Sequence, residues 1–250
     1  KQIQIQSGQS DIGSDKLEVR NLSFSYQKQK ILKDISLTTS LGEITCLIGK
    51  NGCGKTTLGK CISGLLRSPS GSIFLNGEEM SSKKLVQESL FIMQEAEFQF
   101  FTNSVLLELK YGLNPSRYVE IEPLLKKFDM WEYRNRHPFS LSGGQMQKLT
   151  LMMAYLSDKR MIVLDEPTSG LDKKSLDTII ELIKEMKKQK IVVVISHDLE
   201  LIAAVSNKCL EIHDGVIQRI CEISSHESIK NMIEIFETND FENRSSPKKR

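Results

Sequence analysis

The sequence predicts an α/β fold in which a parallel β-sheet forms the core and helices cover both of its faces. Short runs that are almost wholly apolar, such as 161–164 and 191–195, alternate along the chain with helical patterns. Strands buried on both faces have this composition, and their alternation with helices is typical of parallel sheets. With 250 residues, of which 39% are hydrophobic, the chain is long enough to enclose a sizeable core.

The elements of this core follow one another in a regular order. Those expected are a strand at 43–49, a helix at 55–65, a strand at 90–93, a helix at 142–156, a strand at 161–165, a helix at 173–188 and a strand at 191–196. Two regions interrupt the alternation. The more polar strands at 17–37 and 72–76 suit an antiparallel sheet at one edge, and 104–136 is helical without strands. We therefore expect an antiparallel β-subdomain and an inserted α-helical subdomain at about 95–158.

The two ends of the chain differ from this core. Residues 1–15 have the Gln, Ser and Gly content of a linker, so the folded domain is expected to span 16–238. The last elements expected are a hairpin of strands at 208–213 and 216–220, joined by Asp214-Gly215, and an amphipathic helix at 225–237. Residues 239–250 have too few apolar side chains to pack and are expected to form a disordered tail. The linker-like beginning, which has no Met, fits a piece of a longer polypeptide as well as a trimmed chain.

Charge and cysteine content argue against several classes of protein. The 34 Lys and Arg residues nearly balance the 32 Asp and Glu residues, so no basic face and no nucleic-acid partner are expected. The five Cys residues include no C-x-x-C pair, which indicates neither a disulfide framework nor a zinc site and fits a reducing cytoplasm. No apolar run approaches the ~20 residues of a membrane-spanning helix. If a membrane is involved, a partner supplies it.

A glycine-rich segment between the first expected core strand and helix has the pattern of a phosphate-binding loop. It consists of Gly49, Lys50, Asn51, Gly52, Cys53, Gly54, Lys55, Thr56 and Thr57. Its glycines let successive backbone N–H groups turn towards phosphate, and the helix N-terminus adds its dipole. Lys55 can then reach the β- and γ-phosphates, and the Thr56 hydroxyl can bind Mg²⁺. The segment therefore predicts a P-loop NTPase core that binds a nucleotide.

Two carboxylates, Asp165 and Glu166, follow directly after the apolar run at 161–164. Parallel sheets bind their ligands at the carboxyl ends of the strands. There Asp165 would hold Mg²⁺ through water, and Glu166 would polarise the water that attacks the γ-phosphate. Acidic pairs at strand ends are often only helix caps or solvated turns, and it is the phosphate loop that favours the catalytic interpretation.

A second segment of small residues opens the helix at 142–156. It reads Leu141, Ser142, Gly143, Gly144 and Gln145. A helix that begins in this way leaves free N–H groups for an anion. With this signature the chain, over roughly 17–219, resembles the ATP-binding domains of the ABC family. The resemblance implies ATP and Mg²⁺ as cofactors and a second ABC ATP-binding domain as partner, either a copy of this chain or a different half, whose phosphate loop faces the signature.

The resemblance assigns roles to four further residues. Tyr26 would stack on adenine, although a strand aromatic can also belong to the core, as Phe24 could. Gln94 matches the Gln that touches Mg²⁺ and the attacking water, Asp172 lies in a loop that crosses the dimer interface, and His197 matches the histidine that contacts the γ-phosphate. The expected catalytic residues are Lys55, Gln94, Glu166 and His197, and the expected metal ligands are Thr56, Gln94 and Asp165. Because the set is complete, the site is expected to hydrolyse ATP.

The sequence departs from the family pattern in two places. Met146-Gln147-Lys148 follow the signature where the family usually has a basic residue and then Gln-Arg, and the segment after Gln94 lacks a proline that is common in importers. Coupling between the signature and the phosphate is therefore expected to be weaker, and docking of the partner is expected to be specialised. Cys53, beside Lys55 at a helix N-terminus, is also a candidate for a lowered pKa and for alkylation that MgATP would prevent. A small residue tolerated for its size explains Cys53 equally well.

The segment from Gln94 to Leu113 resembles the ATPases of energy-coupling factor importers for vitamins and metal ions, in which it grips cytoplasmic helices of a transmembrane subunit. Phe98, Phe100 and Phe101 would suit such a contact, although core packing of a ring is an alternative. Some of these proteins join two ATPase halves in one chain. The resemblance thus implies a peripheral ATPase on the cytoplasmic face of the cell membrane. The rivals are a soluble ABC ATPase of translation or DNA repair and a regulatory ATP-binding subunit without turnover.

Overall fold

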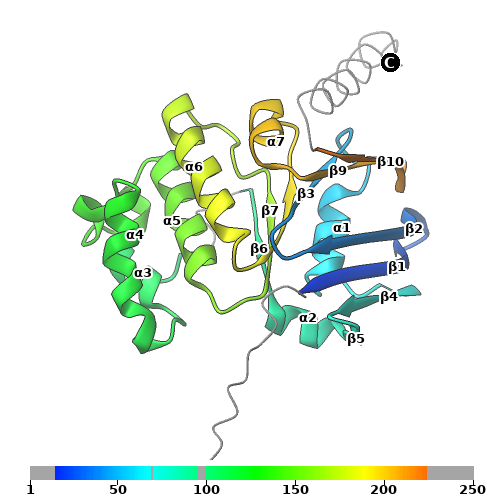
Figure 1. Cartoon of the computed structure of the whole chain (residues 1–250), viewed down its shortest axis with the longest axis horizontal. Helices are drawn as coiled ribbons and strands as arrows, with labels where there is room; N and C mark the ends of the chain where they lie inside the picture. The colour runs from blue at the N-terminus through cyan, green and yellow to red at the C-terminus, as the bar shows by residue number, and fades with distance from the viewer. Residues whose placement is uncertain (1–14, 69, 95–99, 224–250) are drawn as a thin grey trace, which may run out of the picture.

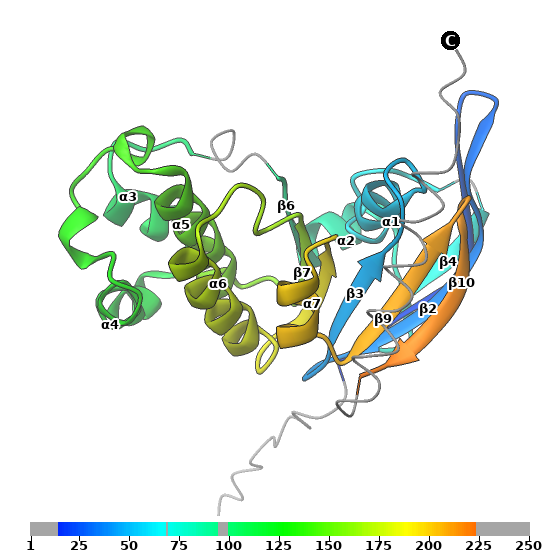
Figure 2. The ribbon, with the colours of Figure 1, turned by 90° about the horizontal axis from the view of Figure 1, so that it is seen from above.

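The computed structural model describes residues 15–68, 70–94 and 100–223. In this part of the chain a six-stranded sheet has the order β10-β9-β3-β8-β7-β6, and a four-stranded sheet has the order β2-β1-β4-β5. Figures 1 and 2 show helices α5, α6 and α7 on one side of the larger sheet, and helix α1 with the smaller sheet on the other. The expected α/β fold, with its parallel core, antiparallel subdomain and helical insertion, is confirmed.

The larger sheet is parallel except at one edge. Its strands are β3 (Ile44–Ile48), β6 (Ser89–Ile92), β7 (Met161–Asp165), β8 (Ile191–Ile195), β9 (Lys208–His213) and β10 (Val216–Glu222). Only β10 runs antiparallel to its neighbour. Every residue of β3, β7 and β8 is buried because helices or strands cover both faces, which explains their continuous apolar composition.

The smaller sheet packs beside α1 (Lys55–Ile62). It consists of β2 (Gln29–Ser40), β1 (Lys16–Tyr26), β4 (Ser70–Leu75) and β5 (Glu78–Glu79), all paired antiparallel. Its inward side chains, among them Leu17, Leu32 and Ile73, form one cluster with α1 and with the facing residues of the larger sheet. The alternation of buried and exposed residues along these strands gives them the more polar composition seen in the sequence.

A helical region projects from the far edge of the larger sheet (Figure 2). It contains α3 (Val105–Lys110), a 3-10 helix (Pro115–Glu120), α4 (Ile121–Lys127), 3-10 turns at Trp131–Tyr133 and Pro138–Ser140, and α5 (Gly143–Leu156). Helix α5 packs against α6 (Lys173–Met186), and their apolar faces belong to the same cluster as the sheet. No helix in the described ranges is long and apolar enough to cross a bilayer.

The element boundaries differ from the expected ones mainly at helix ends. Helix α1 ends at Ile62 instead of 65, and α6 ends at Met186 instead of 188. Two helices of seven residues each, α2 (Ser82–Glu88) and α7 (Leu199–Val205), were not predicted individually. The expected linker at 1–14, the helix at 225–237 and the tail at 239–250 lie outside the described residues. Asp15 is described, and its side chain accepts hydrogen bonds from Asn76 and Arg160.

Two tight turns with the same backbone conformation differ in what surrounds them. Asn76-Gly77 and Asp214-Gly215 both have positive φ angles, of 55° and 79° in the first turn and 46° and 80° in the second. A Cβ atom at Gly215 would lie 2.1 Å from the carbonyl oxygen of Ile31, whereas one at Gly77 would meet nothing within 4 Å. The Gly215 carbonyl also accepts a hydrogen bond from the Lys33 N–H at 2.7 Å. The second turn thus holds β2 against the edge of the larger sheet.

We expect Gly215→Ala to lower the free energy of unfolding by about 3 kcal/mol, because it adds a clash with backbone to the cost of a positive φ. Gly77→Ala adds only the cost of a positive φ, so we expect it to lower the free energy of unfolding by about 1 kcal/mol. Urea denaturation of the two variants beside the wild type measures both values. Equal losses in the two variants would contradict the packing of the 214–215 turn on β2.

Candidate nucleotide site

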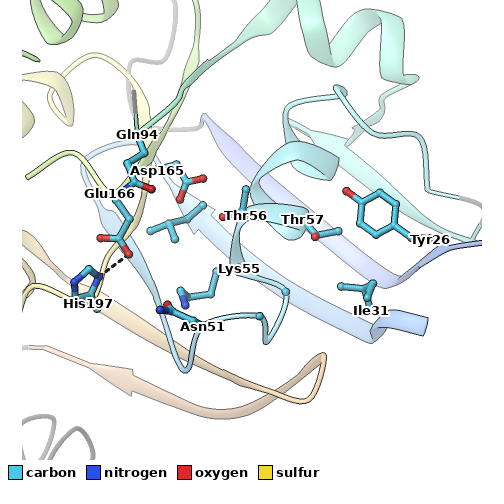
Figure 3. A pocket seen from close by; sticks show the side chains of 13 residues that line it. Tyr26, Ile31, Asn51, Lys55, Thr56, Thr57, Gln94, Asp165, Glu166 and His197 are labelled. Carbon is cyan, nitrogen blue, oxygen red and sulfur yellow. Dashed lines mark hydrogen bonds and ion pairs between the residues drawn. The ribbon is translucent and has the colours of Figure 1, made fainter. Parts of the chain in front are cut away.

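A cavity of about 440 Å³ lies at the carboxyl edge of the parallel sheet, and extends from the start of α1 to the end of β1 and the start of β2 (Figure 3). The residues that line it are Tyr26, Ile31, Asn51, Gly52, Gly54, Lys55, Thr56, Thr57, Gln94, Asp165, Glu166, Ile195 and His197. They come from strands and loops far apart in the sequence. Ligands of open α/β sheets bind at this edge.

The phosphate loop occupies one wall of the cavity. Gly54, with φ of 111°, immediately precedes α1, so the first N–H groups of the helix open into the cavity without a side chain in front of them. Gly49 approaches the backbone of β9 so closely that a Cβ atom would lie 2.2 Å from the Ile212 oxygen. The Lys55 ammonium donates hydrogen bonds to the carbonyl oxygens of Gly49 at 2.7 Å and Lys50 at 3.0 Å. The loop is thus held as a concave, positively charged cradle.

Thr56 and Asp165 form the floor of the cavity beside this cradle (Figure 3). Burial raises the pKa of the Asp165 carboxyl, and a hydrogen bond from Thr56 lowers it by less. Gln94 lines the same cavity, and its amide nitrogen donates to the Ser169 hydroxyl at 3.3 Å. No group of three His, Cys, Asp or Glu side chains in the described residues could hold a metal alone. One hydroxyl, one amide and one carboxylate instead fit Mg²⁺, which retains waters and takes phosphate oxygens as ligands.

Glu166 and His197 make up the opposite wall. Glu166 has the uncommon φ of +50°, and its N–H donates to the Ile195 carbonyl at 2.8 Å. One carboxylate oxygen lies 2.8 Å from Nδ1 of His197, and the other accepts a hydrogen bond from the Ser196 hydroxyl at 3.2 Å. Left-handed backbone at a non-glycine residue costs energy and is concentrated at functional sites. The carboxylate is therefore held in one orientation beside the cavity.

Tyr26 and Phe24, the candidates for the ring that stacks on adenine and the ring that belongs to the core, lie side by side at the other end of the cavity. Tyr26 lines it and is 47% exposed, while Phe24 is buried and stands edge-on to the Tyr26 ring, with centroids 4.9 Å apart. The open Tyr26 ring can stack on a base, and Phe24 is the core aromatic. Ile31 faces the same space from β2 and was not singled out from the sequence, where it is one apolar residue of a strand.

The signature residues lie apart from this cavity. Ser142 caps α5 in a reciprocal arrangement, in which its hydroxyl accepts from the Gln145 N–H at 3.4 Å and its own N–H donates to the Gln145 side chain at 3.0 Å. Ser142 and Gly143 are exposed. Asp172 caps α6 and accepts from the Ser175 N–H at 2.8 Å. Of the expected binding residues, those that do not line the cavity are Gly49, Cys53, Ser142, Gly143, Gly144, Gln145 and Asp172.

The expectation of a lowered pKa for the Cys53 thiol is wrong in direction. Burial raises the pKa of the Cys53 thiol, and the nearby Lys55 charge opposes this only in part. The side chain is 9% exposed and belongs to the apolar cluster beneath the phosphate loop. Cys53 therefore fills space under the loop, in accordance with the alternative that its size is what matters.

A phosphate cradle and a carboxylate pair at the edge of a parallel sheet define a P-loop nucleotide-binding domain. Residues 32–169 match the ABC transporter family, and the chain belongs to this family of ATPases.

Several known proteins are similar to this chain. It is 35% identical over 211 residues to a putative ABC transporter ATP-binding protein of Treponema denticola, and the alignment covers 84% of this chain and 43% of the relative. The chain thus spans less than half the length of that relative. An energy-coupling factor transporter ATP-binding protein, EcfA1 of Fusobacterium nucleatum, is 32% identical over 236 residues, with 90% of this chain and 86% of the relative covered. A solved ATP-binding subunit of an ABC transporter superimposes with a TM-score of 0.74 at 26% identity, covering 88% of this chain and 93% of that subunit.

We expect Cys53 to be alkylated slowly by iodoacetamide near neutral pH, at the same rate with and without MgATP, because it is buried and its pKa is raised. Cys221, which is only half-buried on β10, is expected to react faster. Peptide mapping by mass spectrometry after timed labelling measures both rates, and Cys221→Ser identifies the faster peptide. Rapid labelling of Cys53 that MgATP suppresses would contradict this.

Proposed function

We propose that the chain is the ATP-hydrolysing subunit, or half of a tandem ATPase, of an energy-coupling factor importer that takes up a vitamin or a metal ion. The observation that carries the ATPase part is one cavity lined both by the phosphate loop, with Lys55 and Thr56, and by the Glu166–His197 pair. The similarity to an energy-coupling factor ATP-binding protein supports the choice of transporter. In this proposal the chain is bound peripherally at the cytoplasmic face of the cell membrane.

The first step of the proposed mechanism is binding and orientation of ATP. Lys55 and the amides at the start of α1 hold the β- and γ-phosphates, with Asn51, Gly52, Gly54 and Thr57 completing the cradle. Tyr26 stacks on the adenine. Thr56 and Gln94 would hold Mg²⁺ directly and Asp165 would hold it through water. The ion, when bound, neutralises charge that develops on the transferred phosphoryl group.

The second step is attack of water on the γ-phosphate. Glu166 accepts a hydrogen bond from the water, orients it, and takes its proton as the new bond to the γ-phosphorus forms and the bond to the leaving ADP oxygen breaks. Ser196 and His197 keep the carboxylate in place. His197 is largely exposed on the cavity wall, where its ring can also contact the γ-phosphate. Positioning and charge stabilisation account for catalysis, and no covalent intermediate is needed.

A second ABC ATP-binding domain completes the site. Its Ser142, Gly143, Gly144 and Gln145, or their equivalents, would approach the γ-phosphate from across the interface, together with the loop that contains Asp172. The start of α5 supports this role, because Ser142 and Gly143 are exposed and do not line the chain's own cavity. The facing domain is a copy of this chain or a different half.

The transmembrane partner would dock near the segment Gln94 to Leu113. Phe101 and Tyr111 support this placement, since both rings are largely exposed and lie side by side, with centroids 6.3 Å apart. Phe98, also expected in this contact, lies outside the described residues. Phe100 is buried, so it belongs to the core instead of the docking surface.

We expect Glu166→Gln to bind MgATP and form a dimer while its turnover falls roughly 10²- to 10⁴-fold, because the variant keeps the shape of the side chain but cannot accept a proton. Size-exclusion chromatography with and without MgATP measures the dimer, and phosphate release measures turnover. Glu200→Gln, an exposed substitution on α7, is the matched control and should hydrolyse ATP at the wild-type rate. Unreduced turnover in Glu166→Gln would exclude Glu166 as the residue that orients the water.

A further inference from the structure

A buried carboxylate fixes the segment that leads into α3. Glu108 is 1% exposed, and its Oε2 accepts hydrogen bonds from the Thr102 N–H at 2.8 Å and from the Thr102 hydroxyl at 2.6 Å. The Phe101 N–H lies 3.2 Å from both carboxylate oxygens. Glu108 also stands in the first turn of α3, where the helix dipole favours a negative charge. Residues 101–102 are thus clamped onto α3.

The aromatic rings of Phe100 and Phe101, next to this clamp, lie in opposite environments. Phe101 is exposed beside Tyr111, whereas Phe100 enters the core cluster that contains the sheet and α5. Because the two residues share a peptide unit, the bond from the Phe101 N–H to Glu108 also fixes the direction in which Phe100 enters the core. Glu108 therefore restrains the backbone on which the Phe100 ring stands.

Phe100 in turn contacts the 3-10 turn that precedes the signature. Its ring stands edge-to-face with the ring of Phe139, with centroids 6.1 Å apart and an interplanar angle of 67°. The turn at Pro138–Ser140 is followed by buried Leu141 and then by Ser142, the cap of α5. The contact thus lies three residues from the first polar residue of the signature.

The backbone joins the same two segments. The N–H groups of Val105 and Leu106, at the start of α3, donate to the carbonyl oxygens of Arg136 at 3.0 Å and Arg134 at 2.9 Å. Together with the ring contact and the carboxylate clamp, these bonds make the segment after the Gln94 loop and the segment before the signature one packed unit.

We propose that Glu108 and the Phe100–Phe139 contact are positioning groups for the signature, which hold its backbone in the orientation that the facing nucleotide requires. Neither group touches the nucleotide cavity of its own chain. The proposal rests on the function proposed above, in which the signature completes the site of a second domain. A binding group works only when its supporting contacts hold it within a narrow range of positions.

Hydrogen exchange of the isolated chain without nucleotide tests this positioning directly. In Phe139→Ala, the peptide that covers 141–147 should exchange roughly three- to tenfold faster than in the wild type, because the variant loses the ring contacts of Phe139 with Phe100 and with His137. Glu108→Gln should act in the same direction. Phe139→Tyr retains the ring and should exchange as the wild type does. Val119→Ala, a loss of exposed apolar surface elsewhere in the helical region, is the matched control.

The second readout is MgATP-driven dimerisation in the Glu166→Gln background. Adding Phe139→Ala should weaken the dimer roughly three- to tenfold, while the affinity of the monomer for a fluorescent ATP analogue stays unchanged. Phe139 is more than half exposed, so we expect its truncation to leave the fold intact. Unchanged exchange of peptides from β8 would be the check. Unaltered exchange at 141–147 in Phe139→Ala would overturn the proposal. A Glu166→Gln parent that does not dimerise would instead contradict the proposed function, and the exchange result would still decide the positioning role.

Discussion

The register of the three central parallel strands is the constraint on which the site depends. Leu47 of β3 and Asp165 of β7 both lie opposite Ile195 of β8. The three strands therefore end at one level, and the bonds from the Glu166 N–H to Ile195 and from the Ser196 N–H to Leu47 extend the ladder one residue further. Because side chains alternate along a strand, a slip of one residue would turn Asp165 away from the phosphate loop and an apolar neighbour towards it.

This rigid edge carries groups that reduce stability. Lys55 and Asp165 are both nearly buried, and burying a charge is costly unless it is paired. Two loop carbonyls accept from the Lys55 ammonium, whereas burial raises the pKa of the Asp165 carboxyl by more than its hydrogen bond from Thr56 lowers it. Glu166 adds a left-handed backbone. The wholly buried strands on either side are what hold these unfavourable groups in one place, in the arrangement that binding an anion and a cation together requires.

The parts of this structure that were predictable are those in which local sequence and global fold agree. Continuous apolar runs predicted the central strands, the glycine pattern predicted the phosphate loop, and the small residues from Ser142 to Gly144 indicated the start of α5. The short helices α2 and α7 were missed because seven residues are too few to show a helical period. Ile31 and Cys53 depend on how the smaller sheet and α1 pack together, which no local pattern contains.

Cys53 shows why site chemistry is harder to predict than site position. Its sequence neighbours, a lysine and a helix N-terminus, both favour a thiolate, whereas its position beneath the loop places it among apolar side chains. Burial outweighs the charge because desolvation acts on the whole group while the Lys55 ammonium is already engaged by two carbonyls. The sequence shows that a charge is near the thiol, but the effect of that charge on the thiol pKa depends on burial, which the fold determines.

The nucleotide-binding cavity and the signature stand on different parts of the fold. The phosphate loop, Asp165 and Glu166 stand on the edge of the buried sheet, while Ser142 stands at the start of α5, directly after a turn that contacts the helical region. One chain thus presents a complete cradle and, separately, a signature that does not line it. In the proposed assembly two such domains would share two sites, so hydrolysis would depend on association, and a partner that shifts the helical region would alter the signature without disturbing the sheet edge.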